Sequence, residues 1–317
     1  MNVGILGLGR IARTMAYTVQ HMEESTAYAV ASRNLGKAEA FAKEFEFAHA
    51  YGSYEEMLND PKVELVYIAT PHSFHYEQAK MCLEHGKHVL CEKAFTEHAY
   101  QAEEIFKLAD EKHLFIMEAQ MVPFMPMAKT LQKLIADKVI GEPMNLMARL
   151  SYEMTKKERV MKPELAGGAL LDIGIYTINI ANLVFGTDVK RVTSHAIMTD
   201  TGVDGQFTIN MEYPGGKLAT LMCSVYTTCD RIGVIGGTKG YIEIQNINHL
   251  EAIRVYNDQR ELTATYERPA QINEFEHELR AAIKAIEAGK TECEEVSHGE
   301  TLRILRLMDS LREEWNK

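Results

Sequence analysis

The chain has 317 residues, which is enough for two domains that each enclose a hydrophobic core. Its net charge of −11 and the lack of a basic block argue against a nucleic-acid-binding surface. No run of about 18 apolar residues predicts a membrane span, and a signal peptide is not expected because the first apolar strand begins at Val3.

The cysteines are odd in number, scattered along the chain and without C-x-x-C spacing. This usage is typical of reduced thiols in the cytoplasm and not of a disulfide framework. His72 and His75 lie close together, but Glu77 and Cys82 do not complete a recognisable ligand spacing with them. We therefore expect a cytoplasmic protein without a metal ion.

Short apolar strands alternate with helical patterns over the first 120 residues. Strands are predicted at 3–6, 28–31, 65–69, 88–90 and 115–117, and helices at 10–20, 35–45, 53–59, 74–85 and 97–113. Such alternation predicts an α/β unit with a parallel sheet and right-handed crossovers. Residues 1–120 are accordingly expected to form a Rossmann-type NAD(P)-binding domain.

Residues 121–317 follow a different pattern, in which strands predominate. The predicted strands are 144–152, 190–199, 205–212, 217–226, 231–235, 241–246, 250–256 and 261–266. Helices are predicted at 127–136 and at 169–185, and two amphipathic helices close the chain. We expect an α+β domain with a large, mostly antiparallel open sheet.

A glycine-rich turn follows the first strand, with the sequence Gly7-Leu8-Gly9-Arg10-Ile11-Ala12. Gly7 permits a tight turn, Gly9 lets the backbone approach a pyrophosphate, and Ala12 allows close packing of helix on strand. The free N–H groups at Arg10 and Ile11 then face the phosphates. The turn predicts dinucleotide binding, and the alternative is an ordinary glycine-rich turn between a strand and a helix.

The second strand ends in Ala31-Ser32-Arg33 without the carboxylate that usually binds the adenosine ribose of NAD. Ser32 can donate to a 2′-phosphate, Arg33 can pair with it, and Lys37 adds positive charge one helical turn later. These residues favour NADP, with NAD possible. The alternative is that Arg33 and Lys37 are solvated surface residues.

Three further motifs stand in order along the chain: Thr70-Pro71-His72-Ser73-Phe74-His75, Glu92-Lys93, and Asp172-Ile173-Gly174-Ile175-Tyr176. Together with the N-terminal glycines they make the chain resemble the Gfo/Idh/MocA oxidoreductase family over nearly its whole length. The Asp-x-Gly-x-Tyr motif is similar to that of the dihydrodiol dehydrogenase and xylose dehydrogenase branch.

This resemblance implies roles for individual residues. Thr70, Pro71 and His72 would form a loop along the nicotinamide half of the cofactor, and His75 would begin the next helix. Glu92 would pack near the nicotinamide ribose, and Lys93 would reach the reacting oxygen, with Ala94 where the Glu-Lys-Pro motif has proline. The resemblance also implies a homodimer or higher homo-oligomer formed through the second sheet.

Hydride transfer at a carbinol carbon requires a group that takes the hydroxyl proton. Asp172 and Tyr176 lie four residues apart, so they share one face of an apolar helix, and Gly174 between them suggests that something packs close. Lys93 follows a parallel strand at its carboxyl end, where ligands bind. We expect all three to meet across a cleft between the domains, where the charge of Lys93 makes the Tyr176 hydroxyl more acidic and Asp172 orients substrate or lysine.

Several alternatives remain open for these side chains. Lys93 or Tyr176 could be the final proton carrier, Asp172 could be a structural salt-bridge partner, Tyr176 a core tyrosine and Lys93 a solvated lysine. Asp204 and Asp230 could reach a substrate or lie in surface turns. Residues 156–159 are expected to be solvated.

The sequence thus predicts an NADP-dependent oxidoreductase that moves a hydride between nicotinamide and a sugar, polyol, diol or related small hydroxy or carbonyl compound. The alternative is a non-catalytic NADP(H)-binding sensor. The joint presence of Lys93, Asp172 and Tyr176 favours the enzyme.

Overall fold

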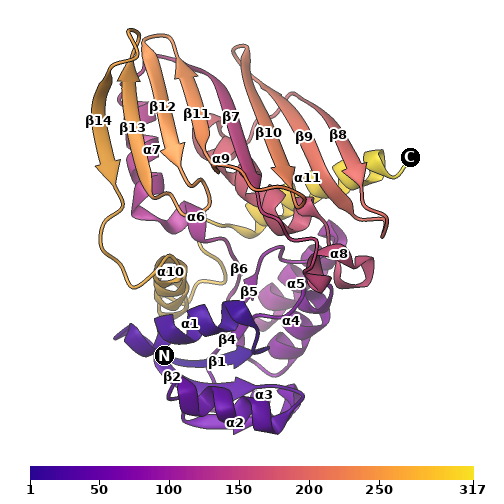
Figure 1. Ribbon diagram of the computed structural model, residues 1–317. Helices are drawn as coiled ribbons and strands as arrows, with labels where there is room; N and C mark the ends of the chain where they lie inside the picture. Colours follow the sequence, from indigo (N-terminus) through magenta and orange to yellow (C-terminus); the bar gives the residue numbers. More distant parts are fainter. The chain divides into compact units, whose positions relative to one another are not determined.

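The computed structural model describes all residues from 1 to 317 and divides them into two compact units (Figure 1). Unit 1 contains Met1–Met121 and Gln271–Arg306, and unit 2 contains Val122–Ala270 and Leu307–Lys317. Two consecutive domains, residues 1–120 and 121–317, were expected from the sequence. In the structure the chain instead returns to unit 1 at Gln271.

Unit 1 is built on a six-stranded parallel sheet with the order β3-β2-β1-β4-β5-β6. The interior strands are almost entirely buried, as parallel strands covered on both faces should be. This confirms the predicted Rossmann-type sheet. The strands are β1 (Asn2–Leu6), β2 (Thr26–Ala31), β3 (His49–Tyr51), β4 (Leu65–Ile68), β5 (His88–Glu92) and β6 (Ile116–Ala119).

The edge strand β3 was not predicted, because it has three residues, none of them fully buried, and therefore no periodic signal. The helices of unit 1 largely follow the predicted ranges. Two of them are preceded by a residue whose side chain caps the helix: Asn34 accepts from the amide of Lys37 at 3.0 Å, and Ser53 accepts from the amide of Glu56 at 3.2 Å. The helices are α1 (Arg10–His21), α2 (Leu35–Glu44), α3 (Tyr54–Leu58), α4 (His75–Glu84), α5 (Ala99–Lys112) and α10 (Phe275–Glu287), together with the start of α11 (His298–Trp315).

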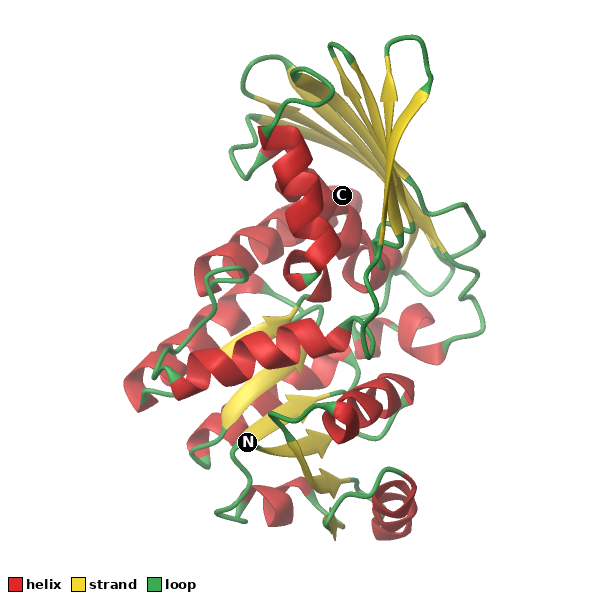
Figure 2. Cartoon of the chain, turned by 90° about the vertical axis from the view of Figure 1, so that its left-hand side faces the viewer, coloured by secondary structure: helices red, strands yellow, loops and turns green.

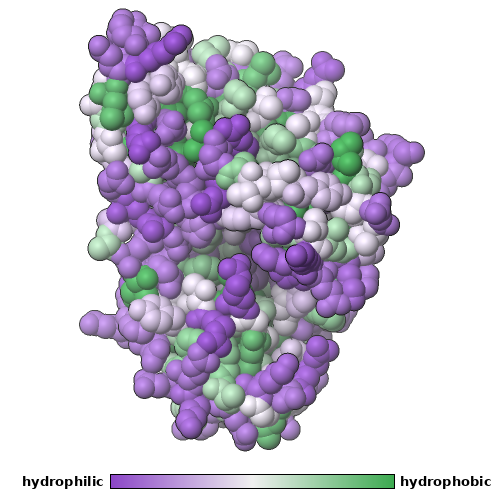
Figure 3. Space-filling model, viewed as in Figure 1, coloured by the Kyte–Doolittle hydropathy of each residue, from purple (hydrophilic) through white to green (hydrophobic).

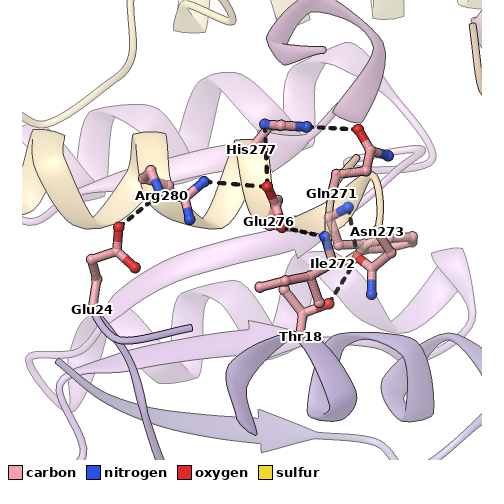
Figure 4. A network of polar contacts seen from close by, with 9 residues as sticks. Thr18, Glu24, Gln271, Ile272, Asn273, Glu276, His277 and Arg280 are labelled. Carbon is pink, nitrogen blue, oxygen red and sulfur yellow. Dashed lines mark hydrogen bonds and ion pairs between the residues drawn. The ribbon is translucent and has the colours of Figure 1, made fainter. Parts of the chain in front are cut away.

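A polar network joins the returning segment to α1 (Figure 4). The Thr18 hydroxyl donates to Oδ1 of Asn273 at 2.9 Å, and Nε of Arg280 donates to Oε1 of Glu24 at 2.7 Å. Glu276 accepts from the amide of Ile272 at 2.7 Å and so orders the turn into α10. Because α1 follows the glycine turn, this network supports the helix on which the predicted phosphate site depends.

Unit 2 is built on an eight-stranded sheet with the order β14-β13-β12-β11-β7-β10-β9-β8. Only β7 and β10 pair in parallel, which confirms the mostly antiparallel sheet predicted from the sequence. The strands are β7 (Pro143–Ser151), β8 (Arg191–Met198), β9 (Asp204–Tyr213), β10 (Lys217–Ser224), β11 (Gly233–Gly237), β12 (Gly240–Gln245), β13 (Ala252–Asn257) and β14 (Leu262–Glu267).

Helices cover one face of this sheet, and the other face carries none (Figure 2). Along β9 and β10 the buried Phe207 and Leu221 alternate with exposed residues that include Leu218. The covering helices are α7 (Pro126–Ala136), α9 (Ile175–Phe185) and the end of α11; two short helices, α6 (Met121–Phe124) and α8 (Glu158–Met161), complete the set. The helical stretch Pro163–Phe185 is long and apolar enough to cross a membrane by composition, but 78% of that window is buried, as in a core helix.

Candidate active site

The glycine turn leaves β1 with the geometry that a dinucleotide site needs. Gly7 has φ +88°, and a Cβ there would lie 2.7 Å from Cγ2 of Thr70, so only glycine fits. Gly9 is different, because a Cβ there would meet only the carbonyl oxygen of Ala69, at 3.9 Å. The protein itself therefore leaves room at Gly9, which fits a position that a phosphate approaches.

The amino end of α1 begins directly after this turn. Arg10 is exposed and Ile11 half-buried, whereas Ala12 is fully buried against the sheet as predicted. No side chain caps the helix at Gly9, so its first N–H groups stay available for a phosphate. The residues present thus fit the pyrophosphate of NAD(P).

The end of β2 places the three residues predicted to select the cofactor. The Ser32 amide donates to the carbonyl of Tyr51 at 3.2 Å, and its hydroxyl accepts from the amide of Asn34 at 3.3 Å. Arg33 and Lys37 are exposed. The positive charge of Arg33 acts on Tyr54, but burial outweighs it and raises the pKa of the Tyr54 hydroxyl. No carboxylate ends this strand.

The loop after β4 carries Thr70, Pro71 and His72 and is held by buried hydrogen bonds. The Thr70 hydroxyl donates to Oε1 of Gln78 at 2.6 Å, and His72 is 7% exposed. His75 is fully buried, with Nδ1 2.9 Å from the carbonyl of Ala94 and Nε2 2.9 Å from that of Thr70. The ring therefore links the Thr70 loop to the turn after β5. Burial lowers the pKa of His75, against the opposing effect of the hydrogen bonds to backbone carbonyls.

The turn after β5 contains Glu92 and Lys93. The Tyr67 hydroxyl and the Lys93 amide both donate to the Glu92 carboxylate, the latter at 3.2 Å. The Lys93–Ala94 peptide bond is cis. Strands β1, β4 and β5 neighbour one another in the parallel sheet, so their carboxyl ends bring together the glycine turn, the Thr70 loop and Lys93.

Two further buried acids, Glu118 on β6 and Glu278 on α10, lie near Glu92 and Tyr67 in unit 1. Glu118 accepts from the amide of Phe95 at 2.9 Å, and burial raises its pKa to about 7. Both carboxyl oxygens of Glu278 lack a protein partner, and burial followed by the charges of Glu92 and Glu118 raises its pKa well above the usual range. Glu118 and Glu278 were not predicted as site residues. In the sequence, Glu278 is one of several acids on an amphipathic helix and nothing distinguishes it from the others.

Asp172 belongs to unit 2 and is 3% exposed. Its Oδ1 lies 2.6 Å from Nη1 of Arg159, whose side chain is 39% exposed. The expected partner of this buried acid is thus a residue from the segment 156–159, which was expected to be solvated. Arg159 was missed as a site residue because its short helix, α8, has no periodic signal.

The predicted helix 169–185 is not regular throughout. Its first turn, Leu170–Gly174, is a π-helix that contains Asp172, and α9 with the half-buried Tyr176 continues from it. A Cβ at Gly174 would lie 2.7 Å from Cζ of Phe207, which confirms that something packs close to this glycine. π-Helical turns occur frequently at functional sites.

The two other acids considered in the sequence analysis have structural partners. Asp204 is 4% exposed and accepts from the Leu170 amide at 2.6 Å, at the start of the π-helical turn. Asp230 pairs with the half-exposed Arg149 at 2.6 Å and the pairing lowers its pKa. Asp204 therefore does not lie in a surface turn, whereas Asp230 does lie on the surface.

Comparison with known proteins matches two parts of the chain to domain families. Residues 1–120 match the oxidoreductase family with an NAD-binding Rossmann fold, and residues 128–243 match the GFO/IDH/MocA C-terminal domain. Trans-1,2-dihydrobenzene-1,2-diol dehydrogenase of Xenopus tropicalis is 34% identical over 76% of this chain and 74% of its own length. The human enzyme of that name is 34% identical over 77% and 74%.

Among solved structures, KijD10, a 3-ketoreductase from Actinomadura kijaniata in complex with NADP and TDP-benzene, is similar in fold. It superposes with a TM-score of 0.90 at 25% identity and covers 99% of this chain and 97% of its own. These matches favour the enzyme over the sensor considered above. The chain belongs to the Gfo/Idh/MocA family and is an NAD(P)-dependent oxidoreductase that acts on CH–OH groups.

Proposed function

We propose that this enzyme prefers NADP and transfers a hydride between nicotinamide and a sugar, polyol, diol or related small hydroxy or carbonyl compound. The observation that carries the proposal is the convergence of the glycine turn, the Thr70 loop and Lys93 at neighbouring strand ends in unit 1. The dihydrodiol in the names of its relatives and the description of KijD10 as a 3-ketoreductase that binds NADP and TDP-benzene support this proposal.

Bound NADP supplies the hydride acceptor, or in the reverse direction NADPH supplies the donor. Lys93 holds a positive charge at the reacting oxygen and stabilises the alkoxide character that develops there. Tyr176 exchanges the hydroxyl proton, and Asp172, held by Arg159, orients the substrate. Residues 1–120 thus act as the cofactor domain, and the sheet-bearing part of residues 121–317 supplies substrate contacts.

The preference for NADP rests on the end of β2. Ser32 and Arg33 provide a hydroxyl and an exposed guanidinium, and Lys37 lies at the amino end of α2. A 2′-phosphate gains charge-assisted hydrogen bonds from such groups, whereas a carboxylate at this place would repel it. His72, Thr70 and Pro71 then line the nicotinamide half.

We also propose a cytoplasmic homodimer that forms through the helix-free face of the unit 2 sheet. Met147, Ile197, Leu218 and Met222 are 43–64% exposed on this face. Figure 3 shows apolar groups as separate patches among polar ones on the molecular surface. Leu218→Lys should shift the elution volume from dimer to monomer, while Lys107→Met, a change at an exposed helix residue of unit 1, should not. A monomeric wild type would contradict this assembly.

The substrate class is tested by following absorbance at the nicotinamide band with NADP or NADPH over a panel of aldoses, polyols, cyclic diols and dicarbonyls. Parallel assays with NAD and NADH measure the preference for NADP. Turnover of at least one panel compound, with a higher kcat/KM for the phosphorylated cofactor, is expected. Equal kcat/KM values for both cofactors would contradict the assignment of Ser32, Arg33 and Lys37.

A further inference from the structure

The π-helical turn that carries Asp172 is fixed from outside by strand β9. Asp204, the first residue of β9, accepts hydrogen bonds from the amide of Leu170 at 2.6 Å and from that of Ala169. Three residues further along the strand, Phe207 fills the space that Gly174 leaves open. One strand thus contacts both the beginning and the end of the turn Leu170–Gly174.

The residues before the turn are shaped to let the Asp204 carboxylate in. Gly168 has φ +111°, and a Cβ there would overlap Oδ1 of Asp204. A Cβ on Gly167 would overlap the carbonyl oxygen of Val160, to which the Gly168 amide donates at 2.8 Å. These contacts bind the end of α8, which carries Arg159, to the turn that carries its partner Asp172.

Asp204 is also an unusual capping residue, because it is 4% exposed. Burial raises the pKa of its carboxyl to about 7, against the opposing effects of hydrogen bonds from the amides of Leu170, Asp204 itself and Ala169 and of the charge of Arg312 from α11. The other titratable group that faces it is the buried thiol of Cys223 on β10. A surface cap would stabilise the helix at a lower desolvation cost, which indicates that the position of this carboxylate matters.

We propose that Asp204 is a positioning residue of the substrate site, which caps the π-helical turn and thereby sets the directions of Asp172 and Tyr176 without contacting the substrate. The inference rests on the proposed function for its catalytic consequence only. Its structural part concerns unit 2 alone and can be measured whether or not a substrate is known.

The test compares Asp204→Ala, which removes the acceptor for the amides of Leu170 and Ala169, with Asp204→Asn. The asparagine side chain has the same shape as aspartate and keeps one acceptor oxygen. Asp200→Ala changes an exposed acid four residues earlier and serves as the matched control. Backbone hydrogen exchange over residues 168–176 should be about tenfold faster in Asp204→Ala than in wild type, near wild type in Asp204→Asn, and unchanged in Asp200→Ala.

With a turned-over substrate, Asp204→Ala should lower kcat by about 10- to 100-fold, because small misplacements of catalytic groups are costly. The dissociation constant of NADPH should stay within a factor of about two, because the glycine turn lies in unit 1, and Asp204→Asn should restore most of kcat. If Asp204→Ala does not fold, Asp204→Ser takes its place. Protection against hydrogen exchange and kcat should then both decrease from wild type to Asp204→Asn and further to Asp204→Ser.

Wild-type exchange protection in Asp204→Ala, or the same loss of kcat in Asp204→Asn as in Asp204→Ala, would overturn the inference. If the wild type turns over no compound with either cofactor, the proposed function fails. The exchange ranking then still decides whether Asp204 positions the turn.

Discussion

The buried acids Asp172 and Asp204 of unit 2 differ from the buried Glu278 of unit 1 in their partners. In unit 2, Asp172 has a guanidinium partner and Asp204 has backbone amide donors, so each acid has a defined direction. In unit 1, Glu278 is equally buried but has no protein partner, and it faces Glu92 and Glu118. The difference teaches that burial alone does not identify a working acid, because its hydrogen-bond and charge partners decide whether the carboxyl group has a fixed direction.

Among these acids and the exposed cation of unit 1, the largest effect is expected when the guanidinium partner of Asp172 is removed. Arg159→Ala removes the guanidinium that pairs with the buried carboxylate of Asp172, and kcat should fall about 100-fold. The kcat of Arg159→Lys should lie between that of wild type and that of Arg159→Ala, because an ammonium pairs with a carboxylate without the fixed planar geometry of a guanidinium. Steady-state kinetics measure both. Lys156→Ala, at an exposed residue of the same segment, should behave as wild type. Full activity of Arg159→Ala would mean that the role of Asp172 does not depend on its pairing with Arg159.

A smaller effect is expected at the exposed cation of unit 1. Arg33→Ala should raise the dissociation constant of NADPH by about tenfold and leave that of NADH nearly unchanged, because only NADPH carries the 2′-phosphate. Titration of cofactor binding measures both constants, with Lys43→Ala on the exposed side of α2 as the control. Equal losses for NADPH and NADH would reject the phosphate role of Arg33.

The smallest effect is a gain in stability at the unpartnered acid. Because the folded-state pKa of Glu278 is raised, the folded protein binds more protons than the unfolded chain above the unfolded pKa of about 4.3. Stability should therefore fall as the pH rises from about 5 to 7, and Glu278→Gln, which cannot ionise, should be more stable than wild type at pH 7.

Urea unfolding at several pH values measures this difference. Glu287→Gln, at an exposed residue near the end of α10, should show no gain. A Glu278→Gln variant that is less stable than wild type at pH 7 would show that the carboxylate is ionised and partnered in solution.

Local sequence patterns predicted much of the fold. The glycine turn, the parallel strands of unit 1 and all eight strands of unit 2 follow from apolar periodicity and from turn residues. The pattern could not predict the return of Gln271–Arg306 to unit 1, because an amphipathic helix shows which face it buries but not against what. The three-residue strand β3 was missed for lack of periodicity.

The same limit applies to the site. Motifs predict Lys93, Asp172 and Tyr176 as site residues, and these roles stay predictions. Arg159 and Asp204 could not be assigned, because each acts on Asp172 or its helical turn through contacts made only in the folded chain. The π-helical turn also packs against Phe207 from a distant strand, which fits there because Gly174 has no side chain.

The central claim is that the Lys93 side chain acts on the reacting oxygen while the cofactor is held by other residues of unit 1. It is tested most directly by single-turnover hydride transfer in Lys93→Met beside wild type, with the dissociation constant of NADPH measured for both. The account predicts a loss of about 1,000-fold in the transfer rate with NADPH binding changed by less than a few-fold. A Lys93→Met enzyme that transfers hydride at the wild-type rate would contradict it.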